Sequence, residues 1–424
     1  MNIKENKNIY RIINILKYAI ILCAILKTQS VYTFFKEIDL HINMILVLLL
    51  STMTVLRWKN NEFVINNKRG IIFLIIYIVY VLIYALLAKC IDRTFFVNFV
   101  IIFGLFFINL AFSFDVKKEI KNVTKVFVNI MVVITVVSLF FFVFGSILKW
   151  IKPSNKIMIN WGEERLIDSY FCIHFNTQTI EVLKNTIYRN SSIFTEAPMF
   201  ALNLSFALAT EIFLNDKKKT NNVIILIIGL ISTLTLSAFV NIFLVYVLWA
   251  IINYKYIILD KKKVILNIIL LIITILFLFV FWGFRSNSAS LSIRIDDYQA
   301  SFKAFSNHAI IGNGYNNELA IKEYFSDFRK YNNGLSNSIF VLLAEGGIYL
   351  SLIYILPQIL IAYESIKFKE KNILAMDIIF IISMFISIYT FTPLMFLNLA
   401  IIDAYIYSKK NKVKEENYIE RMEL

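Results

Sequence analysis

Long runs of apolar residues, each about as long as a membrane-spanning helix, recur along the whole chain. A helix that crosses ~30 Å of hydrocarbon needs about 20 mostly apolar residues. Windows of this kind lie at 10–27, 38–56, 71–88, 95–113, 124–148, 197–214, 223–239, 241–258, 264–283, 337–362, 373–390 and 393–408. The pattern predicts an all-α polytopic membrane protein with about twelve transmembrane helices.

Basic residues gather in every second junction between these windows and after the last one. The clusters contain Arg57, Lys59, Lys68, Arg69, Lys117, Lys118, Lys121, Lys217–Lys219, Lys261–Lys263, Lys367, Lys369, Lys371, Lys409, Lys410, Lys412 and Lys414. Short loops rich in lysine and arginine stay on the cytoplasmic side of a membrane. We therefore expect a multi-pass protein of the cytoplasmic (inner or plasma) membrane, with both termini and the tail 409–424 in the cytoplasm.

The overall composition supports a membrane protein and changes how the charge is interpreted. Of the 424 residues 59% are hydrophobic and 17% are charged, whereas about a quarter of a soluble domain is charged. The net charge of +14 is spread over short clusters at helix ends, which favours contact with anionic lipid headgroups and not with nucleic acid. The first apolar run lacks a small-residue cleavage site, so we expect a permanent first span. The three cysteines, Cys23, Cys90 and Cys172, match no metal, redox or disulfide pattern.

Two connections are much longer than the others in what we expect to be one integral membrane domain, 1–424. They are 149–196, the first outer loop, and 284–336, the second outer loop; the topology places both outside the cytoplasm. Five of the ten arginines lie there. Arginine is preferred where a planar group must hold phosphate or carboxylate through two hydrogen bonds, so an anionic ligand is one interpretation. Pairing with the aspartates and glutamates of the same loops is equally consistent.

Each outer loop also contains a stretch with apolar residues at helical spacing. In 293–305 the residues Ile295, Tyr298, Phe302 and Phe305 share one face of a helix. Such a helix would lie along the outer leaflet or cover a cavity between the spans. Thr177 to Tyr188 has a similar pattern through Ile180, Leu183 and Ile187, and predicts a second amphipathic helix.

Ionisable residues at or inside the predicted spans are costly and are often functional. Glu196 precedes the sixth span, where Thr195 is the expected helix cap and Pro198 fits the first turn. A capping role for Glu196 is as consistent with the sequence as catalysis or sugar binding with Arg189 nearby. Glu345 lies inside the tenth span beside two glycines, which favours a structural hydrogen bond.

Few residues suggest metal or nucleotide chemistry. His308 precedes Gly312 and Gly314, which mark a turn, and a lone loop histidine is more often solvated than catalytic. The chain has no HExxH motif, no Asp-rich metal cluster and no phosphate-binding loop of the GxxxxGK type. We therefore expect no metal and no cofactor.

Four segments carry a resemblance to a known superfamily. They are RNSSIFTEAPMFALNL, TLTLSAFVNIFLVYVL, RIDDYQASFKAFSNHAIIGNG and SNSIFVLLAEGGIYL. Their order and placement resemble the O-antigen ligase and polysaccharide polymerase superfamily, and most of all the Wzy-type polymerases of capsular or exopolysaccharide repeat units. The topological likeness covers the whole chain, whereas the motifs cover about 185–245 and 285–350.

Two departures from the ligase pattern are present. Ligases typically have His-Asn at the start of the tenth span, and this chain has Ser336 and Asn337. Because this removes the expected catalytic histidine of a ligase, it favours a polymerase. The Ser-Arg often found between the seventh and eighth spans is Ser237-Ala238 here, and we draw no conclusion from that change.

The resemblance implies a membrane glycosyltransferase of GT-C-like fold that joins oligosaccharide repeat units carried on undecaprenyl diphosphate at the outer face. It implies metal-independent, inverting transfer, with Glu196 as the catalytic base and Arg189 and Arg294 as the diphosphate clamp. The candidate substrate-binding residues are Arg285, which assists the clamp, Asp297, which is the base in reserve, His308 and Arg165. A chain-length regulator is a candidate protein partner. A ligase that passes polymer to a final acceptor is the first alternative, and a flippase or other transporter of lipid-linked oligosaccharide is the second.

Overall fold

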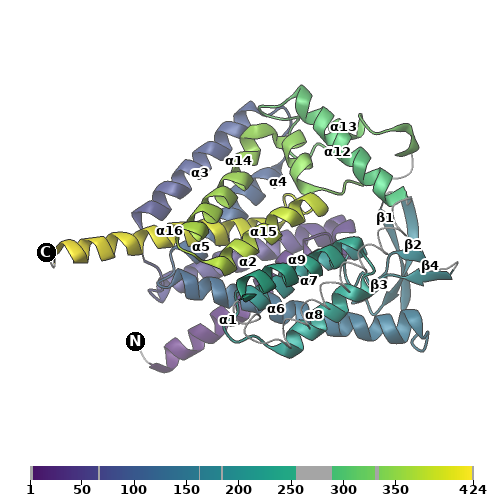
Figure 1. Cartoon of the computed structure of the whole chain (residues 1–424), viewed down its shortest axis with the longest axis horizontal. Coiled ribbons are helices and arrows are strands. Elements are labelled where there is room, and N and C mark those ends of the chain that lie inside the picture. The colour runs from purple at the N-terminus through teal and green to yellow at the C-terminus, as the bar shows by residue number, and fades with distance from the viewer. Residues whose placement is uncertain are drawn as a thin grey trace.

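A computed structural model describes residues 3–64, 67–161, 163–182, 185–254, 289–329 and 334–422, and these form a bundle of helices with five short strands at one end (Figure 1). The first half of the bundle contains α1 (Ile3–Leu26), α2 (Lys36–Lys59), α3 (Lys68–Leu87), α4 (Arg93–Phe96), α5 (Phe103–Ala111) and α6 (Val116–Phe141). The π-helical turns η2 (Val97–Ile102) and η3 (Phe142–Ile147) continue α4 into α5 and extend α6, and the 3-10 turn η1 (Val31–Phe34) precedes α2.

The second half of the chain adds a second set of helices. These are α7 (Ala197–Phe213), α8 (Thr220–Ser232), α9 (Leu236–Ile252), α12 (Ala289–Asn307), α13 (Leu319–Lys322), α14 (Ser338–Lys367), α15 (Lys371–Ile386) and α16 (Pro393–Met422), with the 3-10 turn η4 (Asp327–Arg329) before α14. Nearly every side chain of α7 is buried, as expected for a helix that is apolar on all sides. This central helix carries Glu196 at its N-terminus.

Helices occupy eleven of the twelve predicted windows, and the ninth window, 264–283, lies outside the described residues. Six helical segments are long and apolar enough to cross a membrane: Asn8–Leu26, Lys36–Lys59, Lys68–Leu87, Arg93–Ala111, Val116–Ile147 and Ser338–Lys367. Four shorter apolar helices, Ala197–Phe213, Thr220–Ser232, Leu236–Ile252 and Pro393–Ser408, accompany them. The chain is therefore a multi-pass helical membrane protein, and the count of twelve spans stays a prediction.

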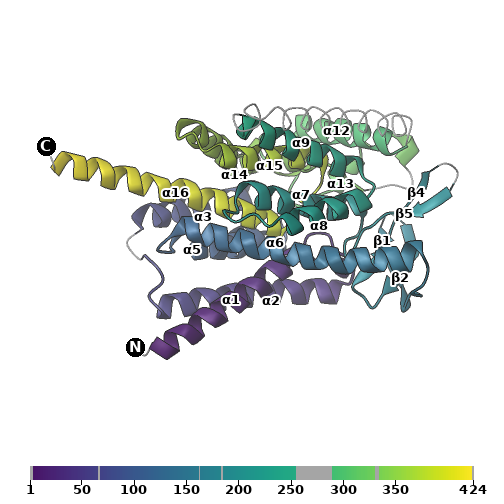
Figure 2. The same cartoon turned by 60° about the horizontal axis from the view of Figure 1, so that its bottom comes forward.

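Both chain termini lie at the end of the bundle opposite to the strands (Figures 1 and 2). We call this the basic end, because the lysine-rich junctions 117–121, 217–219 and 367–371 lie between helices there. The strands and α12 belong to the two outer loops, and both views place them at the other end. The arrangement agrees with the predicted even number of crossings.

The first outer loop folds into strands. A three-stranded antiparallel sheet is formed by β1 (Asn155–Trp161), β2 (Glu163–Tyr170) and β3 (His174–Asn176), and a separate hairpin by β4 (Thr179–Val182) and β5 (Asn185–Tyr188). The amphipathic helix predicted for Thr177 to Tyr188 is therefore wrong. Ile180 pairs with Ile187 across the hairpin, and β-branched residues such as isoleucine, threonine and valine favour strands. In so short a segment the helical spacing is ambiguous, and two short β-branched runs that lie close together in the sequence form a hairpin instead.

The predicted helix at 293–305 is confirmed as part of α12, but its polar side faces the protein. Asp296, Asp297 and Ala300 are buried, whereas Ile295 and Phe302 are 49% and 54% exposed. The helix thus turns carboxylates and small residues inward and leaves apolar side chains for lipid or solvent. This is the orientation expected of a helix lying on the outer leaflet.

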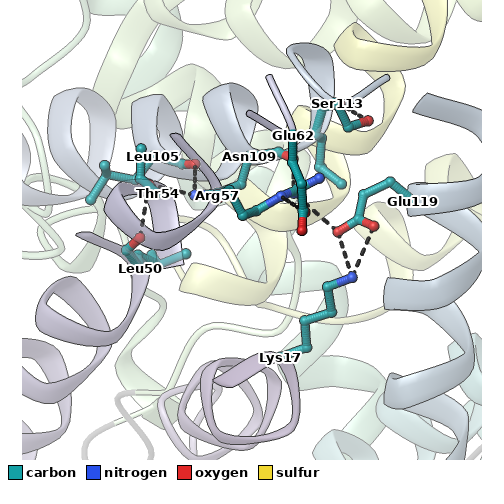
Figure 3. Close-up of polar contacts among 10 residues, drawn as sticks. Lys17, Leu50, Thr54, Arg57, Glu62, Leu105, Asn109, Ser113 and Glu119 are labelled. Atoms are coloured by element: carbon teal, nitrogen blue, oxygen red, sulfur yellow. Dashed lines mark hydrogen bonds and ion pairs between the residues drawn. The ribbon is translucent and has the colours of Figure 1, made fainter. Parts of the chain in front are cut away.

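A buried polar network ties α1, α2 and α6 together (Figure 3). Arg57 is 3% exposed and places its guanidinium 3.2 Å from Glu62 and 3.2 Å from Glu119. Lys17 Nζ lies 2.8 Å from the same Glu119 oxygen and donates to the other carboxylate oxygen at 2.9 Å. The Arg57 guanidinium also donates to the backbone carbonyl of Asn109. Glu119 is therefore shared between the buried Arg57, which also pairs with Glu62, and the partly buried Lys17.

Replacing Glu119 by alanine is expected to destabilise the protein by up to about 3–5 kcal/mol, because the buried Arg57 and the partly buried Lys17 lose the carboxylate that they share and only Arg57 keeps a second partner, Glu62. Thermal unfolding of the purified protein in detergent measures this. The control is Asp216→Ala, which breaks the exposed Lys121–Asp216 pair at 2.8 Å and is expected to cost about 0–1 kcal/mol. Equal melting temperatures for the two variants would contradict the network's importance.

Candidate functional site

Glu196 lies where the first outer loop enters the bundle. It is itself the N-cap residue of α7, with extended dihedrals, and its side chain makes no capping hydrogen bond. The predicted cap at Thr195 is therefore wrong, because the helix begins one residue later. Pro198 occupies the first turn as predicted, where its missing N–H costs nothing. The carboxylate of Glu196 is thus left available for other partners.

Gln178 from the first outer loop holds this carboxylate in place. Its amide Nε2 donates to Glu196 over 3.4 Å, and its Oε1 accepts from the backbone N–H of Ala197 at 3.2 Å. The backbone carbonyl of Gln178 accepts from the N–H of Arg189 at 3.0 Å. Gln178 therefore links the first outer loop to the start of α7 and to the backbone of Arg189.

Arg189 is a largely buried residue that joins the first outer loop to the turn between α8 and α9. Its Nε donates to the carbonyl of Thr233 at 3.2 Å. In that turn the hydroxyls of Thr233 and Thr235 lie 3.1 Å apart, and Ser237 donates to Thr235 at 3.2 Å. The Thr235 side chain caps α9 by accepting from the N–H of Ala238 at 3.0 Å. These contacts fix the direction from which Arg189 approaches Glu196.

Arg294 approaches the same region from the second outer loop. It extends from the first half of α12, and its Nη1 donates to the carbonyl of Ile386 at the C-terminus of α15 over 2.7 Å. This bond uses part of the guanidinium and anchors it near the membrane-embedded helices. Arginine has five donors, so further donors remain for an anionic ligand.

The charges of three predicted arginines act together on Glu196. Burial raises the pKa of the Glu196 carboxyl above its ordinary value, and the guanidinium groups of Arg189, Arg294 and Arg165 oppose this rise. Arg165 comes from β2, so the group draws on both outer loops and on the start of α7. Four of the residues proposed from the sequence therefore lie close enough at this end of the bundle for their charges to interact.

The Asp297 carboxylate is buried and hydrogen-bonded to other side chains of the protein. It is 0% exposed and accepts from Arg329 Nη1 at 2.6 Å and from the hydroxyl of Ser336. Arg329 also lies 3.4 Å from Asp296 and 4.0 Å from the ring centroid of Phe325. Burial raises the pKa of Asp297, while Ser336 and Arg329 oppose the rise. Arg329 is therefore a loop arginine that pairs with carboxylates of its own loop. Asp297 is better suited to holding the loop than to acting as a base.

The Ser336-Asn337 pair occupies structural positions before α14. Ser336 donates to Asp297, and Asn337 caps α14 by accepting from the N–H of Phe340 at 3.0 Å. Where ligases place a histidine, this chain therefore has a hydroxyl that is already bound to a buried carboxylate.

The remaining predicted residues do not join this group. His308 is exposed after the end of α12 and lies 3.2 Å from Lys89 Nζ. It follows Arg294 by 14 positions, which is about 21 Å along a helix. Arg285 lies outside the described residues. Within the described part of the chain, no group of three or more His, Cys, Asp or Glu side chains is arranged to hold a metal.

Neither Gln178 nor a buried polar cluster formed by His174, Ser138 and Asn190 was identified from the sequence. His174 is fully buried, with Nδ1 3.3 Å from the Ser138 hydroxyl, and that hydroxyl donates to Asn190 at 2.6 Å. Burial lowers the pKa of His174 to about 4, so the imidazole is neutral at physiological pH and suits a structural role. Glutamine and serine are common loop residues, and nothing in their spacing indicated these contacts.

Comparison with known families supports the resemblance proposed from the sequence. Residues 222–355 match the Wzy_C family, described as O-antigen ligase, and no curated protein matches the chain. The matched segment contains Arg294, Asp297 and the α8–α9 turn, whereas Glu196 and Arg189 precede it. The match covers about a third of this multi-pass membrane protein and supports its resemblance to the O-antigen ligase and polymerase superfamily.

Proposed function

We propose that the protein is a polymerase of oligosaccharide repeat units carried on undecaprenyl diphosphate. The observation that supports this best is that Arg189, Arg294 and Arg165 lie near enough to Glu196, at the end of the bundle that carries the outer loops, for their charges to favour its carboxylate form. Without a metal, a departing diphosphate needs fixed cations, and arginine stays charged and binds two oxygens at once. A glutamate among these cations can accept a proton from an attacking hydroxyl.

The proposed step is a single displacement. The non-reducing-end hydroxyl of a new repeat unit attacks the anomeric carbon of the growing chain, and its proton passes to Glu196. The bond between that carbon and the diphosphate breaks, and the electron pair leaves with the lipid diphosphate, which Arg189 and Arg294 neutralise. The products are a chain longer by one unit and a free lipid diphosphate. A single displacement inverts the configuration at the anomeric carbon.

Ser336, whose hydroxyl is hydrogen-bonded within the protein, favours polymerisation over ligation. Its hydroxyl is bound to Asp297, so the position supplies neither an imidazole nor a free base. The family description, O-antigen ligase, makes transfer of the finished polymer to a final acceptor the second candidate function. In both cases the donor is a glycan on a lipid diphosphate, and the reaction differs in the acceptor.

Deletion of the gene, with surface and lipid-linked glycans separated by size, distinguishes the candidates. If the protein is a polymerase, we expect single repeat units to persist after deletion while the ladder of long chains disappears. Full-length polymer that stays on lipid would identify a ligase. Repeat units trapped on the cytoplasmic leaflet would identify a flippase and would contradict the proposed active site.

Replacing Arg294 by alanine is expected to slow polymerisation by about a hundredfold, the scale for loss of one preorganised donor to a developing anion. Arg294→Lys keeps the charge but loses the planar group, so an intermediate rate is expected. The measurement is the rate of chain growth on purified lipid-linked repeat units. Lys303→Ala, an exposed change on the same helix, is the control. A wild-type rate for Arg294→Ala would exclude this arginine from the clamp.

A further inference from the structure

A cavity that the proposed reaction does not use lies toward the basic end of the bundle. Its volume is about 100 Å³, and side chains of α6, α7, α14, α15 and α16 line it. The walls are mostly apolar and include Phe127, Phe206, Phe380 and Leu394. An apolar cavity of this kind favours a hydrocarbon chain over water. Its lining includes Leu214 and Ile373, which adjoin the junctions that carry the lysines.

A second, wider cavity of about 470 Å³ adjoins the first at the basic end. The two share Ile120, Leu214, Ile373 and Tyr405 in their linings. The walls of the wider cavity therefore continue into the apolar one. Together they form one cleft, in which we call the wider cavity the mouth and the apolar cavity the interior.

The mouth carries an excess of positive charge. Four exposed lysines line it, namely Lys117, Lys121, Lys369 and Lys371, against the two carboxylates of Asp216 and Glu370. Lys121 pairs with Asp216 at 2.8 Å and Lys117 with Glu370 at 3.5 Å. Lys369 and Lys371 have no carboxylate partner within the residues that the structure describes. Two cations at the mouth are thus available for an anion.

A buried carboxyl group lies between the mouth and the apolar interior. Asp377 lines the apolar cavity, is 4% exposed, and its Oδ1 has no hydrogen-bond partner among the described residues. It follows Lys371 by six positions on α15, or about 9 Å along the helix. Buried polar atoms are nearly always hydrogen-bonded, so an unsatisfied one in a cavity indicates a missing partner. The partner must offer a polar atom at this depth.

We propose that this cleft binds an anionic phospholipid of the leaflet at the basic end. The phosphate lies at Lys369 and Lys371, and one acyl chain enters the apolar cavity. The ester carbonyls lie between phosphate and chain, at the depth of Asp377, and a protonated carboxyl donates one hydrogen bond to such an acceptor. A polyprenyl phosphate has the charge and the hydrocarbon but no carbonyl, and inorganic phosphate has no chain. The ester-bearing lipid therefore accounts for all three features.

The experiment compares lipids on the purified full-length protein in detergent. Phosphatidylglycerol, phosphatidylcholine, undecaprenyl phosphate and inorganic phosphate are titrated separately, and bound ligand is counted by native mass spectrometry. We expect phosphatidylglycerol to bind more tightly than phosphatidylcholine. Equal affinity for the two phospholipids, or displacement of phosphatidylglycerol by equimolar inorganic phosphate, overturns the proposal. Tighter binding of undecaprenyl phosphate would assign the cleft to a polyprenyl lipid instead.

Charge variants test the mouth. Lysines near an anionic lipid surface contribute a factor of about five each, so Lys369→Gln with Lys371→Gln is expected to weaken phosphatidylglycerol binding roughly thirtyfold. The matched control is Lys59→Gln with Lys118→Gln, which removes two exposed charges from the same end but not from the cleft. Equal loss in both pairs would show a general surface attraction and would overturn the site.

Variants at position 377 test the interior. Asp377→Asn keeps a donor and is expected to retain binding, whereas Asp377→Leu is expected to weaken it about tenfold through loss of one buried hydrogen bond. Melting temperatures measured without lipid show that each variant is folded. Unchanged phosphatidylglycerol binding by a folded Asp377→Leu variant would contradict the placement of the ester. Because every readout is lipid binding, the outcome is independent of whether the protein polymerises glycans.

Discussion

Replacing Glu196 by glutamine is expected to reduce the rate of glycan polymerisation by about two to four orders of magnitude, the scale of general-base catalysis. Glutamine is nearly the same size and can keep the contact with Gln178, so the fold around the start of α7 should persist. What is lost is the ability to accept the proton of the attacking hydroxyl. The measurement is chain growth on purified lipid-linked repeat units, corrected for the amount of folded protein.

The pH dependence of the wild-type rate should report the same carboxyl group. Burial raises the pKa of Glu196 above its ordinary value of 4.5, so the carboxylate form that acts as a base is lost at a higher pH than for an exposed glutamate. The rate should therefore rise with pH through this raised pKa and then level off. The glutamine variant should lack this rise, because glutamine does not titrate.

Glu181→Gln is the matched control for this substitution. Glu181 is an exposed carboxylate on β4 of the same outer loop, and its removal should leave both the rate and the pH profile unchanged. A Glu196→Gln enzyme as active as the control would show that Glu196 is not the base. The similarity of residues 222–355 to the O-antigen ligase family would stand, and another proton acceptor would have to be sought among the groups near Arg189 and Arg294.

The membrane-spanning architecture could be predicted because bilayer thickness imposes a length on each apolar run. Windows such as 38–56 and 71–88 match α2 (Lys36–Lys59) and α3 (Lys68–Leu87) to within a few residues at each end. No comparable constraint acts on the outer loops. There the hairpin at Thr179 to Tyr188 was mistaken for a helix, because three apolar positions in a short segment satisfy either periodicity.

The roles of individual arginines could be predicted only in part. Their concentration in the outer loops indicated an anionic ligand, and the charges of Arg189, Arg294 and Arg165 do act on Glu196. Arg329 has the same residue type and lies in the same loop as Arg294, yet it is neutralised by Asp296 and Asp297. Which arginine pairs internally depends on how α12 turns its carboxylates inward. That rotation follows from packing against α14 and is invisible in local sequence.

The glycines near the start of α14 mark a junction whose geometry could not be predicted from the sequence. Gly347 interrupts α14 with φ 61° and ψ −169°, a combination that is essentially restricted to glycine. The break frees the N–H groups of Ile348 and Tyr349 to donate to Ala309 and Ile310 at 2.8 and 3.0 Å. The segment after α12 is thereby bonded along the interrupted helix, and this holds the second outer loop against the bundle.

Replacing Gly347 by alanine is expected to destabilise the protein by at least about 3 kcal/mol, since it adds backbone strain to a steric overlap. A Cβ at this position would lie 2.4 Å from the carbonyl oxygen of Ile310 and 2.6 Å from the N–H of Gly312. Both neighbours are backbone atoms, so neither can move aside without breaking the junction. The measurement is thermal unfolding in detergent, together with the fraction of protein that elutes as a monodisperse species.

Gly104→Ala is the control for the loss of a buried glycine. Gly104 lies within α5, and a Cβ there would meet nothing within 4 Å. Because alanine is favoured over glycine inside a helix by about 0.5–1 kcal/mol, this variant should be neutral or slightly more stable. Similar melting temperatures for the two variants would mean that α14 can straighten at position 347. The docking of the second outer loop, and with it the position of Arg294 beside Glu196, would then not depend on this break.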